Sequence, residues 1–404
     1  MNQKRGTDTE SRAGARMDVS RLFSEDRPDD RPAETAGDTS HTTGILPAQD
    51  LQRAIEAREI QSVEQIADEQ IQPASIDLRL GSKAYRVRAS FLPGLRTVQE
   101  KLHEFAMHEM DITNGGVLER GGVYIIPLME HLNLKHRMSA RGNPKSSTGR
   151  LDVFTRLITD HGTSFDQVRE GYKGPLYAEV SPRTFTILVR KGSRLSQLRI
   201  RRGAPPSSNK MHKELNLQYG LVDRELSDDD IRDGIPITVD VTGSASTGHV
   251  IGYRARNHAG LIDVDRVGYY RVEDFWDPVR SPGKPGLILD PADFYILASH
   301  ESVRVPPGLA AEMIAYDTLV GEFRVHYAGF FDPGFGDVSG GAKAVLEVRS
   351  YEVPFVIEDS QVVGRLAYER LTVAPERLYG VHVQSNYQRQ GLKLSKHFKP
   401  PEHA

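Results

Sequence analysis

Apolar and polar residues alternate with a period of two along much of the chain. In SIDLRLG (75–81) the apolar residues Ile76, Leu78 and Leu80 fall on one side and the charged residues on the other. Such alternation indicates a half-buried β-strand. Short segments of this kind, separated by Gly and Pro, continue to about Arg202. The pattern predicts a mainly β protein, a sandwich or barrel of short strands.

A different period appears in PAQDLQRAIEAREI (47–60), where Leu51, Ala54 and Ile55 form an apolar stripe. That spacing predicts an amphipathic helix. We therefore expect a few short helices among the strands.

The composition changes along the chain and divides it into parts. Residues 1–43 are rich in Asp, Arg, Thr, Gly and Pro and poor in large apolar side chains, which is typical of a disordered extension. Pro and Ser in GAPPSSNKMHKELN (203–216) indicate a linker. We predict a first domain over 44–202, a linker over 203–220 and a second domain over 221–404.

The two predicted domains repeat one another. GVLERGGVYIIPLMEHLNLKHRMSA has a counterpart in LILDPADFYILASHESVRVPPGLAAEM, and a stretch over 249–280 is extra in the second copy. Each copy has a strand that ends in a glutamate, Glu179 in LYAEV and Glu347 in AVLEV. A single such glutamate is usually exposed, but one that recurs becomes a candidate general base, because burial raises the pKa of a carboxyl group.

Composition and charge exclude several classes of function. The net charge of -3 gives no electrostatic basis for binding nucleic acid. The chain contains no cysteine, so disulfides and thiolate metal sites are excluded. No segment is apolar enough for a membrane span or a signal sequence. We expect a cytoplasmic protein.

The segment NPKSSTGR (143–150) concentrates donors for an anion. Lys145 and Arg150 supply charge, and Ser146 and Ser147 supply hydroxyl groups. The order of a Walker loop is missing, so no P-loop ATPase is indicated. On spacing alone, an anion site and a polar turn between strands fit equally well.

Several motifs together resemble a known family. QIQPASIDLRLG, PKSSTGR, GYKGPLYAEV and GSRLSQLRI, in that order, resemble the dCTP deaminase branch of the dUTPase-like superfamily. The second copy adds HYAGFFDPGFG, AVLEV and QVVGRLAYERL, and the tail SNYQRQGLKLSKHF is similar to the family's closing segment. The likeness runs from Gly44 to Lys399. It implies two tandem dUTPase-like β-barrel or jelly-roll domains in a double-length form.

The resemblance implies hydrolytic deamination of dCTP to dUTP and ammonia, without protein-bound zinc. A glutamate would act as general base, which is Glu179 in the first copy and Glu347 in the second. Ser146 and Arg150 would orient the water and the carboxylate. No metal site in the protein is implied, and Mg²⁺ is expected to accompany the triphosphate.

The same resemblance implies a set of nucleotide contacts spread over both copies. These residues are Lys145, Ser146, Ser147, Arg150, Asp166, Asp332, Tyr387 and Gln390.

Departures from the family pattern indicate which of the two copies is expected to hold the working site. In IAYDTLVGEFRVH, Val320 stands where the arginine is expected and Asp317 would repel a triphosphate. The first copy keeps Ser146 and Arg150 beside its own Glu179, and we expect the working site there. A composite site that uses Glu347 with Arg150 from another domain is the alternative.

Family sites lie between subunits, so the resemblance implies a homotrimer, with like domains forming two stacked rings. Two other functions stay open. One is a dUTP pyrophosphatase or a bifunctional deaminase and pyrophosphatase. The other is a non-catalytic nucleotide-binding regulator, because a fold does not fix a function.

Overall fold

A computed structural model describes residues 41–400 except 244–247, 282, 284–285, 316–322, 326–328, 338–339, 351, 383–386 and 389. The predicted disordered segment 1–43 therefore lies, apart from 41–43, outside the described residues. The described residues belong to one compact unit, Asp38–Ala404. No helix within the described part is long and apolar enough to cross a membrane.

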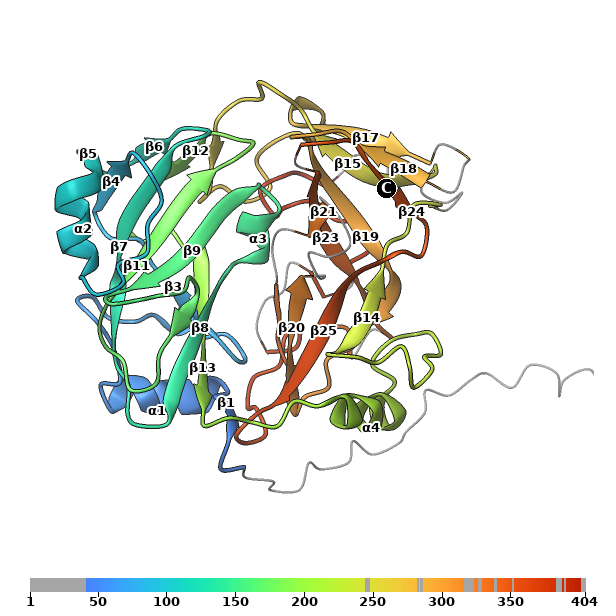
Figure 1. Ribbon diagram of the computed structural model, residues 1–404, viewed down its shortest axis with the longest axis horizontal. Helices are drawn as coiled ribbons and strands as arrows, with labels where there is room; N and C mark the ends of the chain where they lie inside the picture. The colour runs from blue at the N-terminus through green and yellow to red at the C-terminus, as the bar shows by residue number, and fades with distance from the viewer. Residues whose placement is uncertain are drawn as a thin grey trace, which may run out of the picture. The chain divides into compact units, whose positions relative to one another are not determined.

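The structure is mainly β, which confirms the fold class predicted from the alternating pattern (Figure 1). The strands of the first domain are β1 (Gly44–Ile45), β2 (Ile60–Ser62), β3 (Ile76–Leu78), β4 (Lys83–Val87), β5 (Ala106–Asp111), β6 (Gly116–Leu118), β7 (Val123–Asn133), β8 (Met138–Pro144), β9 (Val153–Thr159), β10 (Gln167–Val168), β11 (Lys173–Pro182), β12 (Ile187–Val189) and β13 (Ser196–Arg202).

The second domain continues the chain with a similar set. Its strands are β14 (Ile235–Thr238), β15 (Val250–Ala255), β16 (Ile262–Asp263), β17 (Trp276–Arg280), β18 (Gly286–Leu289), β19 (Phe294–Val303), β20 (Leu309–Ala315), β21 (Phe323–Val325), β22 (Phe330–Phe331), β23 (Ala342–Ser350), β24 (Phe355–Glu358) and β25 (Val362–Arg370). Short helices lie between strands: α1 (Ala48–Glu56), η2 (Asp68–Gln70), α2 (Val98–Phe105), α3 (Ser146–Gly149), α4 (Asn209–Tyr219) and η4 (Val272–Asp274). Residues 371–400 are called the C-terminal segment below.

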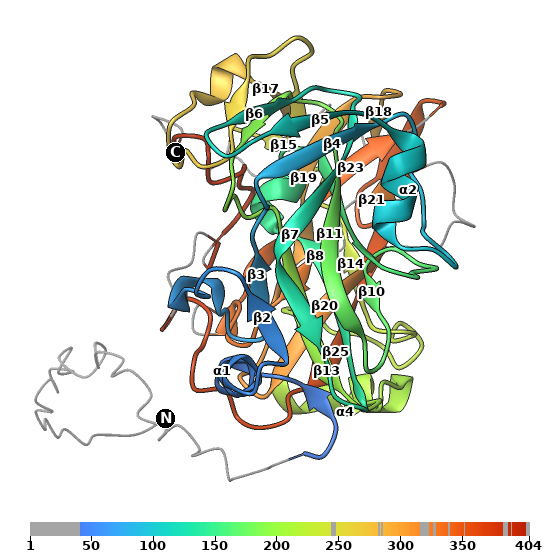
Figure 2. The ribbon, with the colours of Figure 1, turned by 90° about the vertical axis from the view of Figure 1, so that its left-hand side faces the viewer.

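Two sheets build the core of the first domain. One has the order β1-β13-β8-β10 with β3 also on β13, and the other has the order β5-β4-β7-β11-β9 with β2 on β7. The inward residues of both sheets share one apolar cluster, as expected for strands that bury one face. Figure 2 shows the long strands β7 and β11 side by side.

The second domain repeats the central pairing of the first. In the β7–β11 pair Glu179 is opposite Ile125, and in the β19–β23 pair Glu347 is opposite Ile296. The two glutamates therefore occupy equivalent places in the two sheets.

A second pair of glutamates marks the same repeat. Glu130 of β7 is fully buried and accepts the backbone N–H of Arg79 at 2.8 Å. Glu301 of β19 is equally buried and accepts the backbone N–H of Thr238 at 2.8 Å. A buried carboxylate needs such partners, and here each one fixes the strand that precedes it in its own domain.

The extra stretch of the second copy packs on the first domain. Its strand β16 pairs in parallel with β12, joining Ile187 to Ile262. Trp276 is 1% exposed and meets the ring of Phe185 edge-on at 5.5 Å. The tryptophan is thus a core anchor between the domains.

The segment that the sequence indicates as a linker is only partly irregular. Helix α4 begins within it, because the Ser208 side chain caps the backbone N–H of Met211 at 3.2 Å. Met211 and Leu215 are buried in the core of the second domain. Gly220 ends the helix with φ of +59°, a conformation that favours glycine.

Ion pairs join the facing sheets of the two domains. Arg199 of β13 contacts Asp332 at 3.1 Å, and Arg141 of β8 contacts Glu312 of β20 at 2.7 Å. These contacts bring β8 and β13 next to β20 (Figure 1), and Arg201 of β13 pairs with Glu369 of β25. The face of the first domain that carries α3 therefore lies against the second domain.

Candidate active site

The turn after β8 carries the anion-binding motif and has a compact backbone. Thr148 and Gly149 donate their N–H groups to the carbonyl of Lys145 at 2.8 and 3.0 Å, and Arg150 donates to Ser146 at 3.1 Å. Pro144 ends β8 just before the turn, and Lys145 at the start of the turn has an extended backbone, with φ of -65° and ψ of 146°. The result is the single turn α3.

Arg150 is the hub of the site. It is 3% exposed, and its guanidinium donates to the carbonyl of Lys393 and to the side chain of Gln390, both at 2.9 Å. The guanidinium carbon lies 4.0 Å from the ring centroid of Tyr387. A planar cation that is stacked and hydrogen-bonded at once is held in one orientation. The C-terminal segment therefore fixes this arginine of the first domain.

Glu347 faces Arg150 from the second domain. Its Oε1 atom is 3.7 Å from Arg150 Nε, and the side chain is buried. Burial raises the pKa of Glu347 to about 7, although the positive charge of Arg150 acts in the opposite direction. A carboxyl group with this pKa can both accept and return a proton near neutral pH.

A cavity of about 420 Å³ opens between these groups. This volume lies in the range of small-molecule sites. The predicted site residues that line the cavity come from both domains and are Lys145, Ser146, Ser147, Arg150, Asp332, Glu347, Tyr387 and Gln390.

A comparison with protein families fits this geometry. A family model for the N-terminal domain of 2'-deoxycytidine 5'-triphosphate deaminase matches residues 42–204, and one for the C-terminal domain matches residues 208–398. The chain belongs to the dCTP deaminase family. The resemblance seen in the sequence motifs is thereby confirmed.

Individual members of the deaminase family match shorter parts of the chain. "dCTP deaminase, dUMP-forming" from Halobacterium salinarum is 33% identical over 108 residues, 26% of this chain and 52% of that protein. The protein of the same name from Beutenbergia cavernae is 32% identical over 109 residues, 26% of this chain and 54% of that protein. The match thus spans about half the length of these relatives.

A solved member of the deaminase family matches over most of the chain. The crystal structure of 2'-deoxycytidine 5'-triphosphate deaminase from Agrobacterium tumefaciens has a TM-score of 0.78 and 52% sequence identity. The match covers 82% of this chain and all of that one. The tandem arrangement is therefore shared with a solved deaminase.

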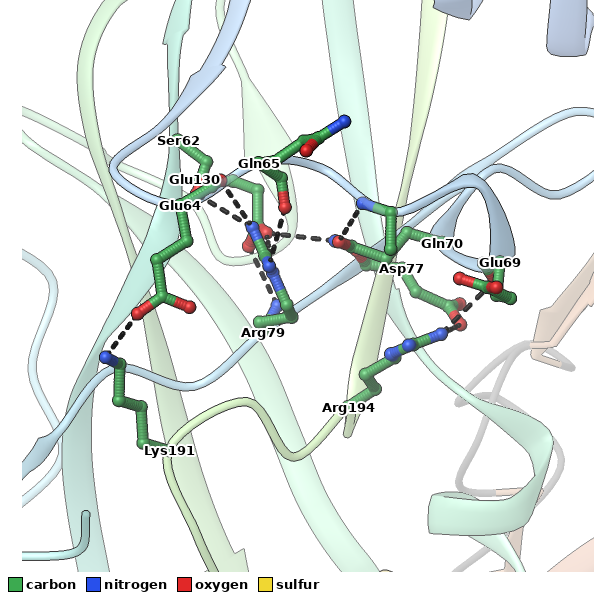
Figure 3. Close-up of polar contacts among 11 residues, drawn as sticks. Ser62, Glu64, Gln65, Glu69, Gln70, Asp77, Arg79, Glu130, Lys191 and Arg194 are labelled. Carbon is green, nitrogen blue, oxygen red and sulfur yellow. Dashed lines mark hydrogen bonds and ion pairs between the residues drawn. The ribbon is translucent and has the colours of Figure 1, made fainter.

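Lys145 is anchored by a buried network on its own domain. Its ammonium pairs with the carboxylate of Asp77, which is 2% exposed. Figure 3 shows the surroundings of Asp77, where Gln70 donates to the Asp77 carbonyl and to Glu130, both at 3.0 Å, and Arg79 contacts Glu130 at 2.8 Å. The network fixes β3, so that Lys145 is presented at the cavity.

The two aspartates expected to bind nucleotide differ in position. Asp332 lines the cavity, is paired with Arg199, and has its pKa raised by burial. Asp166 does not belong to the cavity lining, and its carboxylate accepts the N–H of Leu157 at 2.7 Å. Burial raises the pKa of Asp166 to about 7. The structure therefore brings only Asp332 to the other site residues.

Glu179, the glutamate favoured from the sequence, lies apart from this cavity. It is 1% exposed and pairs with Arg156, whose Nε donates to Glu179 Oε1 at 3.0 Å. The guanidinium carbon of Arg156 lies over the ring of Phe165, 3.5 Å from the ring centroid. Within the chain, Arg150 thus meets Glu347 and not Glu179, which is the arrangement of the composite alternative. Val320 and Asp317 lie outside the described residues.

Three basic residues of the C-terminal segment were not singled out from the sequence. Arg377, His382 and Lys396 line the cavity together with the predicted residues. Burial lowers the pKa of Lys396. Of the three, only Lys396 lies in the basic tail SNYQRQGLKLSKHF, and this composition by itself does not reveal which domain the lysine faces.

One cluster in the second domain has metal-ligating side chains. Asp240, His300 and Asp359 are half-buried, and one ligand atom from each lies within 4.8 Å of the others. His300 Nε2 is 2.9 and 3.0 Å from the two carboxylate oxygens of Asp359. An ordinary imidazole–carboxylate pair explains this contact. None of the three lines the cavity.

Proposed function

We propose that this chain hydrolyses dCTP to dUTP and ammonia at the cavity between its domains. The observation that carries the proposal is the position of Glu347, a buried carboxyl group with a pKa near 7 beside the fixed guanidinium of Arg150. A purely nucleotide-binding regulator needs no such base. Membership of the deaminase family and the mixed basic and hydroxyl lining support the same reaction.

In the proposed reaction Glu347 takes a proton from water as the water oxygen bonds to C4 of cytosine. The protonated carboxyl group gives this proton to N3 of the ring. The carboxylate then takes the proton of the new C4 hydroxyl and passes it to the amino group, so that C4 becomes a carbonyl as the C4–N4 bond breaks and ammonia leaves. Arg150 stabilises the carboxylate form and keeps the side chain in place. One water is consumed for each ammonia released.

The basic and hydroxyl groups at the cavity would bind the triphosphate. Lys145 and Lys396 supply charge, and Ser146 and Ser147 supply hydroxyl donors. We propose that Mg²⁺ arrives with the triphosphate and that the protein itself holds no zinc, as expected from the sequence.

A second reaction is favoured by the names of relatives. Proteins from Halobacterium salinarum and Beutenbergia cavernae are named dUMP-forming. A bifunctional enzyme would also cleave the α–β phosphate bond of the deaminated product. Asp332 is a carboxylate at the cavity that such a step could use.

Product analysis of dCTP turnover tests both proposals. Purified full-length protein with dCTP and Mg²⁺ should release ammonia, and chromatography should show dUTP in equal amount. Appearance of dUMP and pyrophosphate in place of dUTP would establish the bifunctional reaction. Release of no ammonia at any pH from 6 to 9 would contradict the deaminase proposal.

The homotrimer of two stacked rings and the cytoplasmic location are proposals from the family resemblance. Light scattering during size-exclusion chromatography tests the trimer, because a mass three times that of the chain is expected. A monomer would contradict it.

A further inference from the structure

A second ion pair crosses between the domains next to the candidate base. Arg349 of β23 pairs with the carboxylate of Asp152, and both side chains are buried. Arg349 also donates to Thr184 Oγ1 at 2.8 Å, and Thr184 donates to Asp152 at 2.5 Å. Asp152 belongs to the first domain and Arg349 to the second. The pair therefore ties the two domains at this point.

In each domain, the two residues that form the cross-domain ion pairs are two positions apart in the sequence. Glu347 and Arg349 are two residues apart on β23, and alternate residues of a strand point to the same face. Arg150 and Asp152 are also two residues apart, at the end of the α3 turn. The cross-domain contacts are thus Arg150 with Glu347, followed by Asp152 with Arg349, with the signs of charge reversed.

The backbone at Asp152 makes its position definite. Its φ is +54°, in the left-handed region that few residues other than glycine adopt without cost. Its N–H donates to the carbonyl of Gly149 at 2.8 Å, and its carbonyl accepts from Arg183 at 2.9 Å. The chain between Gly149 and Asp152, which includes Arg150, has little freedom to shift while Asp152 is held.

The equivalent strand of the first domain, β11, has no arginine two residues after its glutamate. Ser181 stands two residues after Glu179 on β11, where Arg349 follows Glu347 on β23. Glu179 is instead paired within its own domain, with Arg156. The cross-domain cation thus accompanies only the glutamate that faces Arg150.

We propose that Asp152 and Arg349 form a positioning pair, which holds the α3 turn against β23 so that Arg150 stays beside Glu347. Neither residue touches the reacting atoms. The inference rests on the proposed deaminase function and adds two residues to it.

The positioning role makes a prediction that a merely structural ion pair does not. Among the described residues, Arg150 and, from the C-terminal segment, Tyr387 face Glu347 with charged or titratable side chains. If the α3 turn moves away, the stabilising charge of Arg150 is lost and the pKa of Glu347 rises further. The pH below which kcat falls would then move upward.

The test uses three variants: Asp152→Asn, Arg349→Gln and the double variant. Each single variant leaves a buried group without its charge partner and should lower Tm. The double variant removes both charges and should recover part of that loss. We expect kcat for dCTP to fall by about tenfold to a hundredfold in all three, with KM changed by less than about threefold. The acid limb of the kcat profile should move up by about 0.5 to 1 pH unit, as expected for losing about 1 kcal/mol of interaction with Arg150.

A matched control is Glu369→Gln. Glu369 pairs with Arg201 across the same domain interface, and neither residue lines the cavity. This variant should change Tm while leaving the pH profile and kcat unaltered.

The outcomes separate this inference from the proposed function. Recovery of kcat together with Tm in the double variant, or an unmoved acid limb in all three variants, would overturn the positioning role while leaving the deaminase intact. Wild-type protein that releases no ammonia would overturn the proposed function and this inference with it.

Discussion

Arg150 Nε and Glu347 Oε1 lie 3.7 Å apart, although the two residues come from different copies of the repeat. The separation is longer than a hydrogen bond. Charge attraction stabilises the carboxylate without occupying it with a direct bond, so its oxygens can still receive a proton. Changes to either residue of this pair should therefore alter the activity.

Replacing Glu347 by Gln should abolish the general base. We expect kcat for ammonia release to fall by about a hundredfold to ten thousandfold, because glutamine cannot accept the proton of water. The matched control is Glu179→Gln, which changes the equivalent residue of the first domain and should keep kcat within about threefold. The reverse result would restore Glu179 as the base.

The activity should depend on pH through Glu347. Because burial raises its pKa to about 7, the base is protonated at lower pH. We expect log kcat to fall with decreasing pH below about 7, approaching a slope of one. A profile that is flat between pH 5.5 and 7.5 would exclude Glu347 as the group that titrates.

Glu347 should also make folding stability depend on pH, but with the opposite sign from activity. Stability should fall as the pH rises. The native pKa of Glu347, about 7, is above the ordinary value of 4.5, so the native state binds the proton more tightly than the unfolded chain. Glu347 therefore lowers the free energy of unfolding as pH rises from about 4.5 to about 7, by roughly 3 kcal/mol at most. The Tm of Glu347→Gln relative to wild type should increase over this interval. Parallel Tm curves would show that the native pKa is not raised.

Replacing Lys145 should mainly weaken binding. Lys145→Met removes a cation at the cavity, and we expect KM for dCTP to rise by about tenfold with a smaller change in kcat. Lys145→Arg keeps the charge opposite Asp77 and should retain most of the affinity. Lys210→Met, at an exposed position outside the cavity, controls for the loss of a lysine. Equal KM values for the Met variants would show that Lys145 does not bind the triphosphate.

The buried glutamates of the repeat should differ in their contribution to stability. Glu130→Gln leaves the nearly buried guanidinium of Arg79 without its partner and should cost about 3 kcal/mol. Glu301→Gln should lower the free energy of unfolding by about 1 kcal/mol, because the side chain of its partner Arg224 is 39% exposed and its guanidinium can be hydrated. Denaturant unfolding of both variants measures the difference, and equal costs would contradict this account.

Features set by nearby residues were predictable from the sequence. The apolar stripe of Leu51 and Ala54 predicts α1, and the alternation around Leu78 predicts strand structure. The donors of NPKSSTGR follow from residue type and also line the cavity. Helix α4 was missed because proline and serine precede it, and the serine serves as its cap.

The choice between the two glutamates could not be made in this way. Glu179 and Glu347 have the same local pattern and the same place in their sheets. What separates them is the docking of one copy on the other, through contacts such as Arg199 with Asp332, which are 133 residues apart in the chain. The alternation of apolar and polar residues along the sequence gives no information about such a contact. The sequence therefore yields the set of candidate groups but not their pairing.

The C-terminal segment has a consequence for the history of the gene. Ser395 donates to the carbonyl of Ser147 at 2.7 Å, and Lys393 accepts from Arg150, so the last residues of the second copy complete the turn of the first. Neither copy can be lost by deletion without removing part of the same centre. After such a duplication the halves are free to diverge, but they are no longer free to separate.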